Sequence, residues 1–150
     1  MTPFRAALNR LAALDVSGVA RSYGLETLPE RLNRAQLPAL LVLPGEDRPL
    51  FGAAGEGFRA SAFSGGPKTV VYRPTHLLLV APVRAGQGAR AHLPRLADLI
   101  DAYFSALSDA PTLDGALLEP ASVQIEPGTF DYGGAAYHGC AFRHTWVIEC

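Results

Sequence analysis

The chain is 150 residues long, 49% hydrophobic and 18% charged, with a formal net charge of −1 at pH 7. That length fits a single domain with its own core, and the hydrophobic fraction excludes a chain that is disordered throughout. No apolar run reaches the roughly 18 residues of a membrane helix, and residues 1–5 lack the apolar segment of a signal peptide, so neither a membrane span nor secretion is expected.

The N-terminal residues predict an amphipathic helix followed by a short strand. Thr2 can cap the helix, and Pro3 suits its first position. Residues 15–18 end it, and a short strand is expected over 19–23, before an ordered but irregular segment. The apolar residues of this helix recur on one face: Phe4, Leu8, Leu11 and Leu14.

A buried strand and a long glycine-rich segment come next. The run 39–43, Ala-Leu-Leu-Val-Leu, is apolar throughout, which is typical of a central strand that is covered on both faces. Residues 45–67 contain six glycines, and we expect a long loop or a loose hairpin there. Phe51 and Phe58 are its candidate interface residues, because aromatic side chains carry much of the energy of protein interfaces.

Two further strands and a second helix follow. The strands are expected over 69–72 and 75–83, and the helix from about Pro94 to Leu107. Asp98 and Asp101 fall in the early turns of this helix, where the helix dipole favours acidic side chains. They are the second pair of candidate interface residues.

Two strands close the chain, over 121–126 and 136–150, around a turn at 131–134. The order is helix, strands, helix and two strands. It predicts one α+β domain over 1–150, in which an antiparallel or mixed β-sheet carries two main α-helices.

Two glycine-rich segments match nucleotide-binding motifs only in part, because the residues and elements that these motifs require around the glycines are missing. Residues 55–60, Gly-Glu-Gly-Phe-Arg-Ala, fit a loose dinucleotide pattern, but no strand is predicted before them and no helix after them. Residues 65–69, Gly-Gly-Pro-Lys-Thr, resemble the end of a P-loop, but a proline separates glycine from lysine. No cofactor is therefore expected.

The histidine- and cysteine-containing strand offers the other chemistry. His138, Cys140 and His144 share one face of the expected closing strand, but strand spacing holds them too far apart to converge on one metal ion. The same face carries apolar residues, so a core stripe is the simpler interpretation. Cys140 with His76 as a base is the open enzymatic alternative. Cys140 and Cys150 are expected to be reduced thiols, and no catalytic or metal site is expected.

Charge is unevenly distributed along the chain. Residues 1–95 hold twelve of the 13 basic residues against six acids, and 96–150 hold Arg143 against eight acids. The two parts thus carry about +6 and −7. Either the fold presents two oppositely charged surfaces, or it interleaves the halves and the charges cancel. The charged fraction is also below the usual quarter, which indicates either a surface covered by a partner or one rich in alanine and glycine.

The layout as a whole resembles the tail terminator (tail-completion) proteins of long-tailed bacteriophages, small α+β proteins that form hexameric rings at the head-proximal end of the tail tube. The likeness rests on the first helix, on 36–44 (Gln-Leu-Pro-Ala-Leu-Leu-Val-Leu-Pro), on the glycine-rich excursion, on the helix of 93–107, and on 137–143 (Tyr-His-Gly-Cys-Ala-Phe-Arg) in the closing hairpin. It is a likeness of architecture, so it transfers no catalytic position.

This resemblance implies a structural virion protein of the tail or neck, assembled in the host cytoplasm. Its partners would be five further copies in a ring, the tail tube protein and the head–tail connector, with DNA passing through the ring without specific binding. The alternatives are another phage head–tail adaptor, a module that binds a small ligand or host protein, and a small enzyme using Cys140 or a histidine.

Overall fold

The computed structural model describes residues 3–43, 57–61, 69–84 and 88–149, and it confirms the α+β fold class. The helices are α1 (Pro3–Ala12), η1 (Arg34–Gln36), η2 (Ala89–His92) and α2 (Leu93–Asp109), of which η1 and η2 are 3-10 turns. The strands are β1 (Arg21–Tyr23), β2 (Ala39–Leu43), β3 (Gly57–Ser61), β4 (Thr69–Arg73), β5 (Thr75–Pro82), β6 (Ser122–Tyr132) and β7 (Ala135–Glu149).

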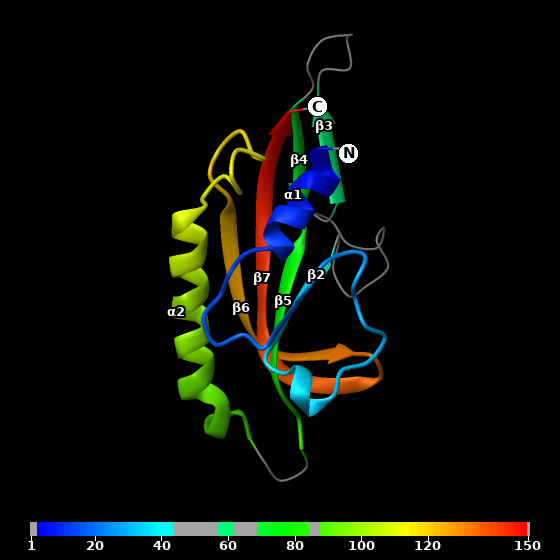
Figure 1. Cartoon of the computed structure of the whole chain (residues 1–150), viewed down its shortest axis with the longest axis vertical. Coiled ribbons are helices and arrows are strands. Elements are labelled where there is room, and N and C mark those ends of the chain that lie inside the picture. Colours follow the sequence, from blue (N-terminus) through cyan, green and yellow to red (C-terminus); the bar gives the residue numbers. More distant parts are fainter. Residues whose placement is uncertain (1–2, 44–56, 62–68, 85–87, 150) are drawn as a thin grey trace.

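A long central strand, β7, organises the sheet (Figure 1). One of its edges pairs with β6, and the other pairs with β4 and β5 in a single register that runs from Thr69↔Glu149 to Leu79↔Gly139. The amide of His144 donates to the carbonyl of Pro74 at 2.9 Å, so the ladder continues through the break between β4 and β5. Beyond them lie β3 and β2, and β1 adds to β2 as the one parallel pair among the described strands.

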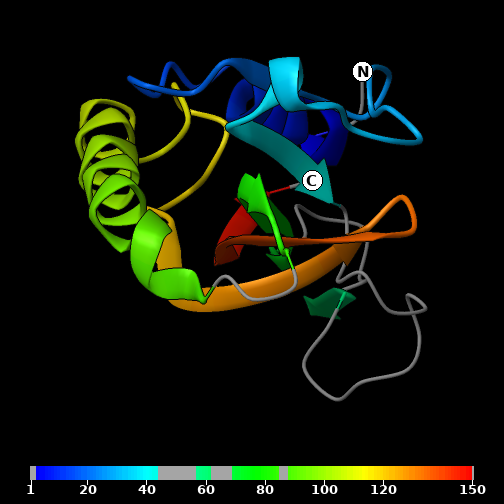
Figure 2. The same cartoon turned by 90° about the horizontal axis from the view of Figure 1, so that it is seen from below.

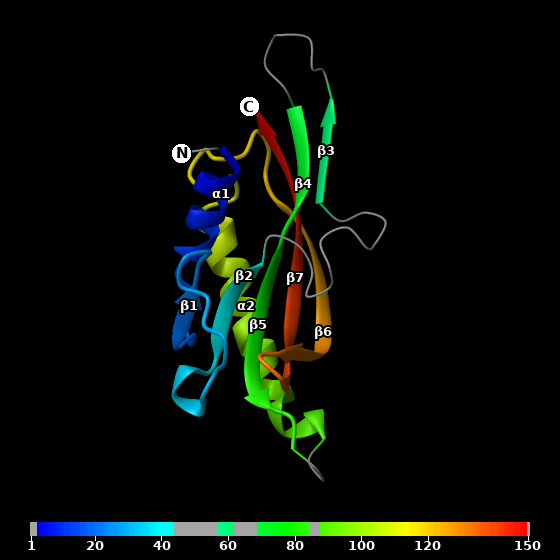
Figure 3. The same ribbon diagram turned by 90° about the vertical axis from the view of Figure 1, so that its right-hand side faces the viewer.

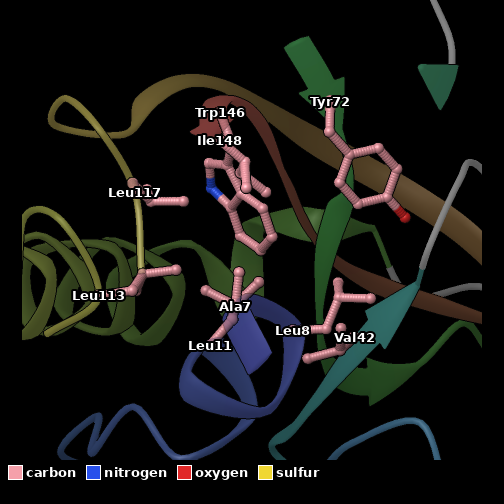
Figure 4. Packing of buried hydrophobic residues seen from close by; sticks show 9 residues of the cluster. All are labelled: Ala7, Leu8, Leu11, Val42, Tyr72, Leu113, Leu117, Trp146 and Ile148. Atoms are coloured by element: carbon pink, nitrogen blue, oxygen red, sulfur yellow. The ribbon is translucent and has the colours of Figure 1, made fainter. Parts of the chain in front are cut away.

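Both α-helices cover the same face of this sheet, as Figure 3 shows. α1 buries Ala7, Leu8 and Leu11 against a cluster that includes Tyr72 and Trp146 (Figure 4). α2 packs its own buried residues against β2, β5 and β7 to form the neighbouring cluster; that cluster contains Leu40, Leu78, Leu96, Leu99, Tyr103, Cys140 and Phe142. The even-numbered positions of β7 all point to this side because side chains alternate along a strand.

The opposite face is covered by the irregular segment 24–37 and by the end of the β6–β7 hairpin (Figure 2). Leu41 and Leu79 pack there with Tyr137, and the hydroxyl of Tyr132 donates to the carbonyl of Pro29. A Cβ on Gly133 would lie 2.4 Å from the carbonyl oxygen of Glu30, so glycine is needed where the hairpin meets this segment. The strand over 39–43, predicted as covered on both faces, is confirmed.

Several boundaries differ from the sequence prediction. α1 ends at Ala12, and Leu14 already belongs to a tighter turn whose amide bonds to the Leu11 carbonyl. β6 continues through Pro127 to Tyr132, so the turn predicted over 131–134 is reduced to Gly133 and Gly134. Both glycines have positive φ, which a two-residue hairpin turn requires.

The segment predicted as a long loop or loose hairpin contains β3, which pairs antiparallel with β4. Residues 45–56 and 62–67 lie outside the described residues, as do Thr2 and Cys150. In the part of the chain that is described, no helix is both long enough and apolar enough to cross a membrane.

Candidate functional site

The candidate interface residues predicted from the sequence are only partly placed by the structure. Asp98 and Asp101 are exposed on the outward face of α2, and Phe104, one turn further along, is 38% exposed. The first turn of α2 contains no acidic residue, so both acids lie beyond the turn in which the helix dipole acts. The expected stabilisation of these acids by the dipole is therefore wrong. Phe51 lies outside the described residues, and of Phe58 only the backbone, in β3, is described.

A hydrogen-bonded network of aromatic and imidazole side chains lies beneath α2. His76 Nδ1 and the hydroxyl of Tyr103 are 2.8 Å apart, and that hydroxyl is 2.7 Å from His144 Nε2. The indole nitrogen of Trp146 lies 3.1 Å from His144 Nδ1. All four side chains are almost completely buried, and the Tyr103 ring stacks on Phe142 at 3.7 Å.

The direction of every hydrogen bond in this network follows from the indole of Trp146, which lies at one end of it. Trp146 can only donate, so His144 accepts at Nδ1 and carries its hydrogen at Nε2. That N–H donates to Tyr103, whose hydroxyl hydrogen then goes to His76 Nδ1. His76 must therefore hold its own hydrogen at Nε2, which has no partner among the described residues.

Burial keeps both imidazoles of the network neutral. It lowers the pKa of His144 to about 3 and, together with the neighbouring His144, lowers the pKa of His76 well below its ordinary value of 6.5. Burial also raises the pKa of the Cys140 thiol to about 11. A thiol with so high a pKa is protonated at neutral pH, so the geometry gives no support to a Cys140 thiolate nucleophile.

The other two histidines form a second group, near the start of α2. His92 is half-buried at the N-terminal end of α2, and its ring packs on that of His138 with 5.2 Å between the ring centres. His138 is 6% exposed, and neither of its ring nitrogens has a partner among the described residues. Leaving such a polar group buried costs about 1–3 kcal/mol.

Two adjoining hollows surround this pair. They are lined by residues from the end of β5 and the start of α2, which lie at the lower end of Figure 1. The first has a volume of about 290 Å³ and is lined by Arg34, Arg84 and Arg95 with His92. The second, of about 230 Å³, is largely apolar and contains His138 with Leu93 and Leu96. Both are bordered by Val80 and His92, and no acidic residue among the described ones lines either. We call them together the basic hollow.

The C-terminal end of α2 carries the opposite charge. A hollow of about 340 Å³ lies between α1 and α2 and is lined by Asp15, Asp109 and Asp114, with Arg10 as its single basic residue. Arg10 pairs with Asp114 at 3.1 Å. We call it the acidic hollow. The 17 residues of α2 separate the two hollows by about 25 Å at ~1.5 Å per residue.

The described residues assemble no metal-binding group of side chains. No group of three or more His, Cys, Asp or Glu side chains there could hold a metal ion. His138, Cys140 and His144 do share one face of β7, as predicted, and all three are buried in the core. In comparisons with known proteins, no family model and no curated protein matches this chain.

Sequence reasoning identified the histidines singly but missed their groupings. Tyr103 joins His76 to His144 from a different element, and the arginines of the basic hollow come from η1, from the residues after β5 and from α2. The sequence contains one indication of these groupings. Polar residues such as His76 and Tyr103 stand at positions where the surrounding pattern of apolar residues predicts the core. A buried polar group needs a hydrogen-bond partner. Such positions therefore predict that a partner exists, but they do not identify it.

Proposed function

We propose that this chain is the subunit of a closed homo-oligomeric ring, of six copies, at the head-proximal end of a phage tail tube. There it ends tail polymerisation and joins the tail to the head connector. The proposal rests on the resemblance of the layout to tail terminator proteins, and the α+β fold of the structure is compatible with it.

The observation that carries the ring is the opposite charge of the two ends of α2. A closed ring needs heterologous contacts, in which one patch of a subunit meets a different patch of the next. The basic hollow and the acidic hollow are two such patches, of complementary sign. The acidic outer face of α2, with Asp98, Asp101 and the exposed Phe104, extends the negative side.

One open edge of the sheet, that of β6, favours assembly through side-chain surfaces over assembly through added strands. β6 pairs only with β7, so no described strand lies along its other edge. That edge strand carries Pro127, which has no amide hydrogen to donate, and Glu126 beside it. Prolines and charges on an edge oppose uncontrolled pairing with another chain.

The decisive experiment is a mass measurement of the purified chain, alone and mixed with tail tube assemblies, by native mass spectrometry. We expect a single closed species of six copies in the mixture, with or without monomers in the free protein. A chain that stays a single copy on the completed tube contradicts the ring. In a parallel mixture with the head connector, a ring that joins the connector and not the tube favours another head–tail adaptor.

A further inference from the structure

The basic hollow also has the composition of a ligand site, and this inference goes beyond its part in the proposed ring. Arg34, Arg84 and Arg95 line its first part, and the described residues provide none of them with an acidic partner. Arginines that line one hollow without carboxylates favour an anion, because each guanidinium group presents several N–H donors that suit phosphate or carboxylate oxygens.

A second observation points to the same ligand from inside the hollow. His138 lines the apolar part, is 94% buried, and has both ring nitrogens unpartnered by described residues. Buried polar groups in proteins nearly always have a partner, and an unpartnered one needs an explanation. A bound polar group reaching this imidazole is such an explanation, since the apolar residues around His138 supply none.

The shape of the hollow indicates that the ligand has an apolar part beside its anionic group. His92 and Val80 line both parts, so the two parts adjoin, and a molecule that spans them would touch the arginines at one end and Leu93, Leu96 and Pro127 at the other. The two volumes, about 290 and 230 Å³, place the combined space within the range of about 300–1,000 Å³ that small-molecule sites occupy. An apolar body is needed to fill the second part, and a bare anion would leave it open.

We propose that the basic hollow binds an amphiphilic anion, an aromatic or branched apolar group that carries a phosphate or carboxylate. The anionic group lies among Arg34, Arg84 and Arg95, and the apolar group lies against Leu93 and Leu96 beside His138. The same chemistry can come from a free small molecule or from an acidic and aromatic segment of another polypeptide.

The test uses phenyl phosphate as the probe, with inorganic phosphate and benzyl alcohol as its two separate halves. Titration calorimetry should give a Kd for phenyl phosphate at least tenfold lower than for either half. The chain has only four histidines, so NMR can follow each ring. The signals of His92 and His138 should shift on binding, and those of His76 and His144 should not. Equal affinity for all three probes, or no shift at His138, would overturn the proposal.

Variants test each part of the hollow. Arg84→Gln with Arg95→Gln should weaken binding of phenyl phosphate at least tenfold, and His138→Phe should weaken it in a chain that remains folded. Arg10→Gln removes one positive charge at the other end of α2, beside Asp114, and is the control that should leave binding unchanged. If Arg10→Gln weakens binding as much as the Arg84 and Arg95 changes do, the effect is general electrostatics and the site is wrong.

A last arm distinguishes the two sources of the ligand. If phenyl phosphate prevents oligomers from forming in native mass spectrometry, the occupant in the assembled protein is a neighbouring polypeptide. If it binds equally well to assembled protein, the occupant is a free small molecule. Either result upholds the site, and neither depends on the number of copies in the ring.

Discussion

The two histidine pairs of this protein lie on the same face of the sheet and differ in how their ring nitrogens are bonded. His76 and His144 are linked through Tyr103 and end on the indole of Trp146, deep between α2 and the sheet. His92 and His138 pack on each other at the edge of the basic hollow, and neither ring nitrogen of His138 has a hydrogen-bond partner among the described residues.

The two pairs therefore differ in role. The hydrogen bonds of His76 and His144 stabilise the fold, whereas the ring nitrogens of His138 are the ones that the proposed ligand would contact. In the first pair, three hydrogen bonds fix the tautomers, and only one nitrogen, Nε2 of His76, is left over. A network so nearly complete specifies one packing of α2 on the sheet. In the second pair, both nitrogens of His138 are buried at a free-energy cost that no described contact offsets.

The change expected to break the first pair most severely is Tyr103→Phe. The ring can still stack on Phe142, but His76 Nδ1 loses its donor and His144 Nε2 loses its acceptor. Two buried polar groups are left without partners, so the free energy of unfolding should fall by about 2–4 kcal/mol in urea denaturation. Tyr137→Phe is the matched control: it removes one 3.3 Å bond to the Leu32 carbonyl and should cost only about 1 kcal/mol. Equal costs for the two variants would contradict the network's role.

The first pair should also make stability depend on pH. The folded pKa of His144, about 3, is below its ordinary value of 6.5, so the folded state binds fewer protons than the unfolded one. Its contribution is therefore complete above about pH 6.5 and is lost as the pH falls toward 3. The maximal slope is about 1.4 kcal/mol per pH unit, which gives roughly 2–3 kcal/mol between about pH 6.5 and 4.5.

His76 adds a loss of the same sign, because its pKa is lowered too. Urea unfolding at a series of pH values measures this dependence, and His144→Gln should give a shallower one than the unchanged chain. If the two slopes coincide, His144 is not neutral in the folded protein.

Matched substitutions at the two pairs should have opposite effects on stability. His144→Phe leaves the indole N–H of Trp146 buried without an acceptor, so we expect a loss of about 1–3 kcal/mol. His138→Phe replaces an unpartnered imidazole by an apolar ring of similar shape, which should change stability by less than about 1 kcal/mol or increase it. Thermal unfolding of both variants measures the contrast. A loss at His138→Phe as large as at His144→Phe would show that His138 has a structural partner.

The same contrast explains what the sequence could predict. Local patterns predicted the α+β class, the strand over 39–43 and the buried face of the closing strand, because periodicity and turn residues act over a few neighbours. They ended the strand before the hairpin turn too early, at residue 126, since a proline at 127 and the polar residues after it hide a strand that continues to Tyr132 and pairs with β7 along its whole length.

The groupings of side chains could not be predicted in this way. Tyr103 meets His76 and His144 across 27 and 41 residues of sequence. The basic hollow likewise gathers Arg34, Arg84 and Arg95 from three separate segments, and the sequence only indicated that positive charge was concentrated before residue 96. Which charges share a surface depends on topology. The Arg10–Asp114 pair shows that the two halves do interleave near α1.

The smallest effect on folding, and the most specific one on assembly, is expected at the outer face of α2. Asp98→Arg with Asp101→Arg reverses two exposed charges in the middle of the helix, away from its first turn. The free energy of unfolding should therefore change by no more than about 0.5 kcal/mol. If the neighbouring subunit presents its basic hollow to this face, the reversed charges repel it. Assembly at low salt should then slow by about tenfold or more, because complementary charge mainly accelerates association.

The matched control is Glu119→Arg with Asp131→Arg, an equal change of charge at exposed positions outside α2. Light scattering at several salt concentrations measures the rates, and the difference between the two double variants should shrink as salt rises, since the screening length is only about 8 Å at physiological ionic strength. A charge-reversed α2 that assembles at the rate of the control would show that these acids face solvent in the assembled protein. The basic hollow would then be open to a small ligand rather than to a neighbouring subunit.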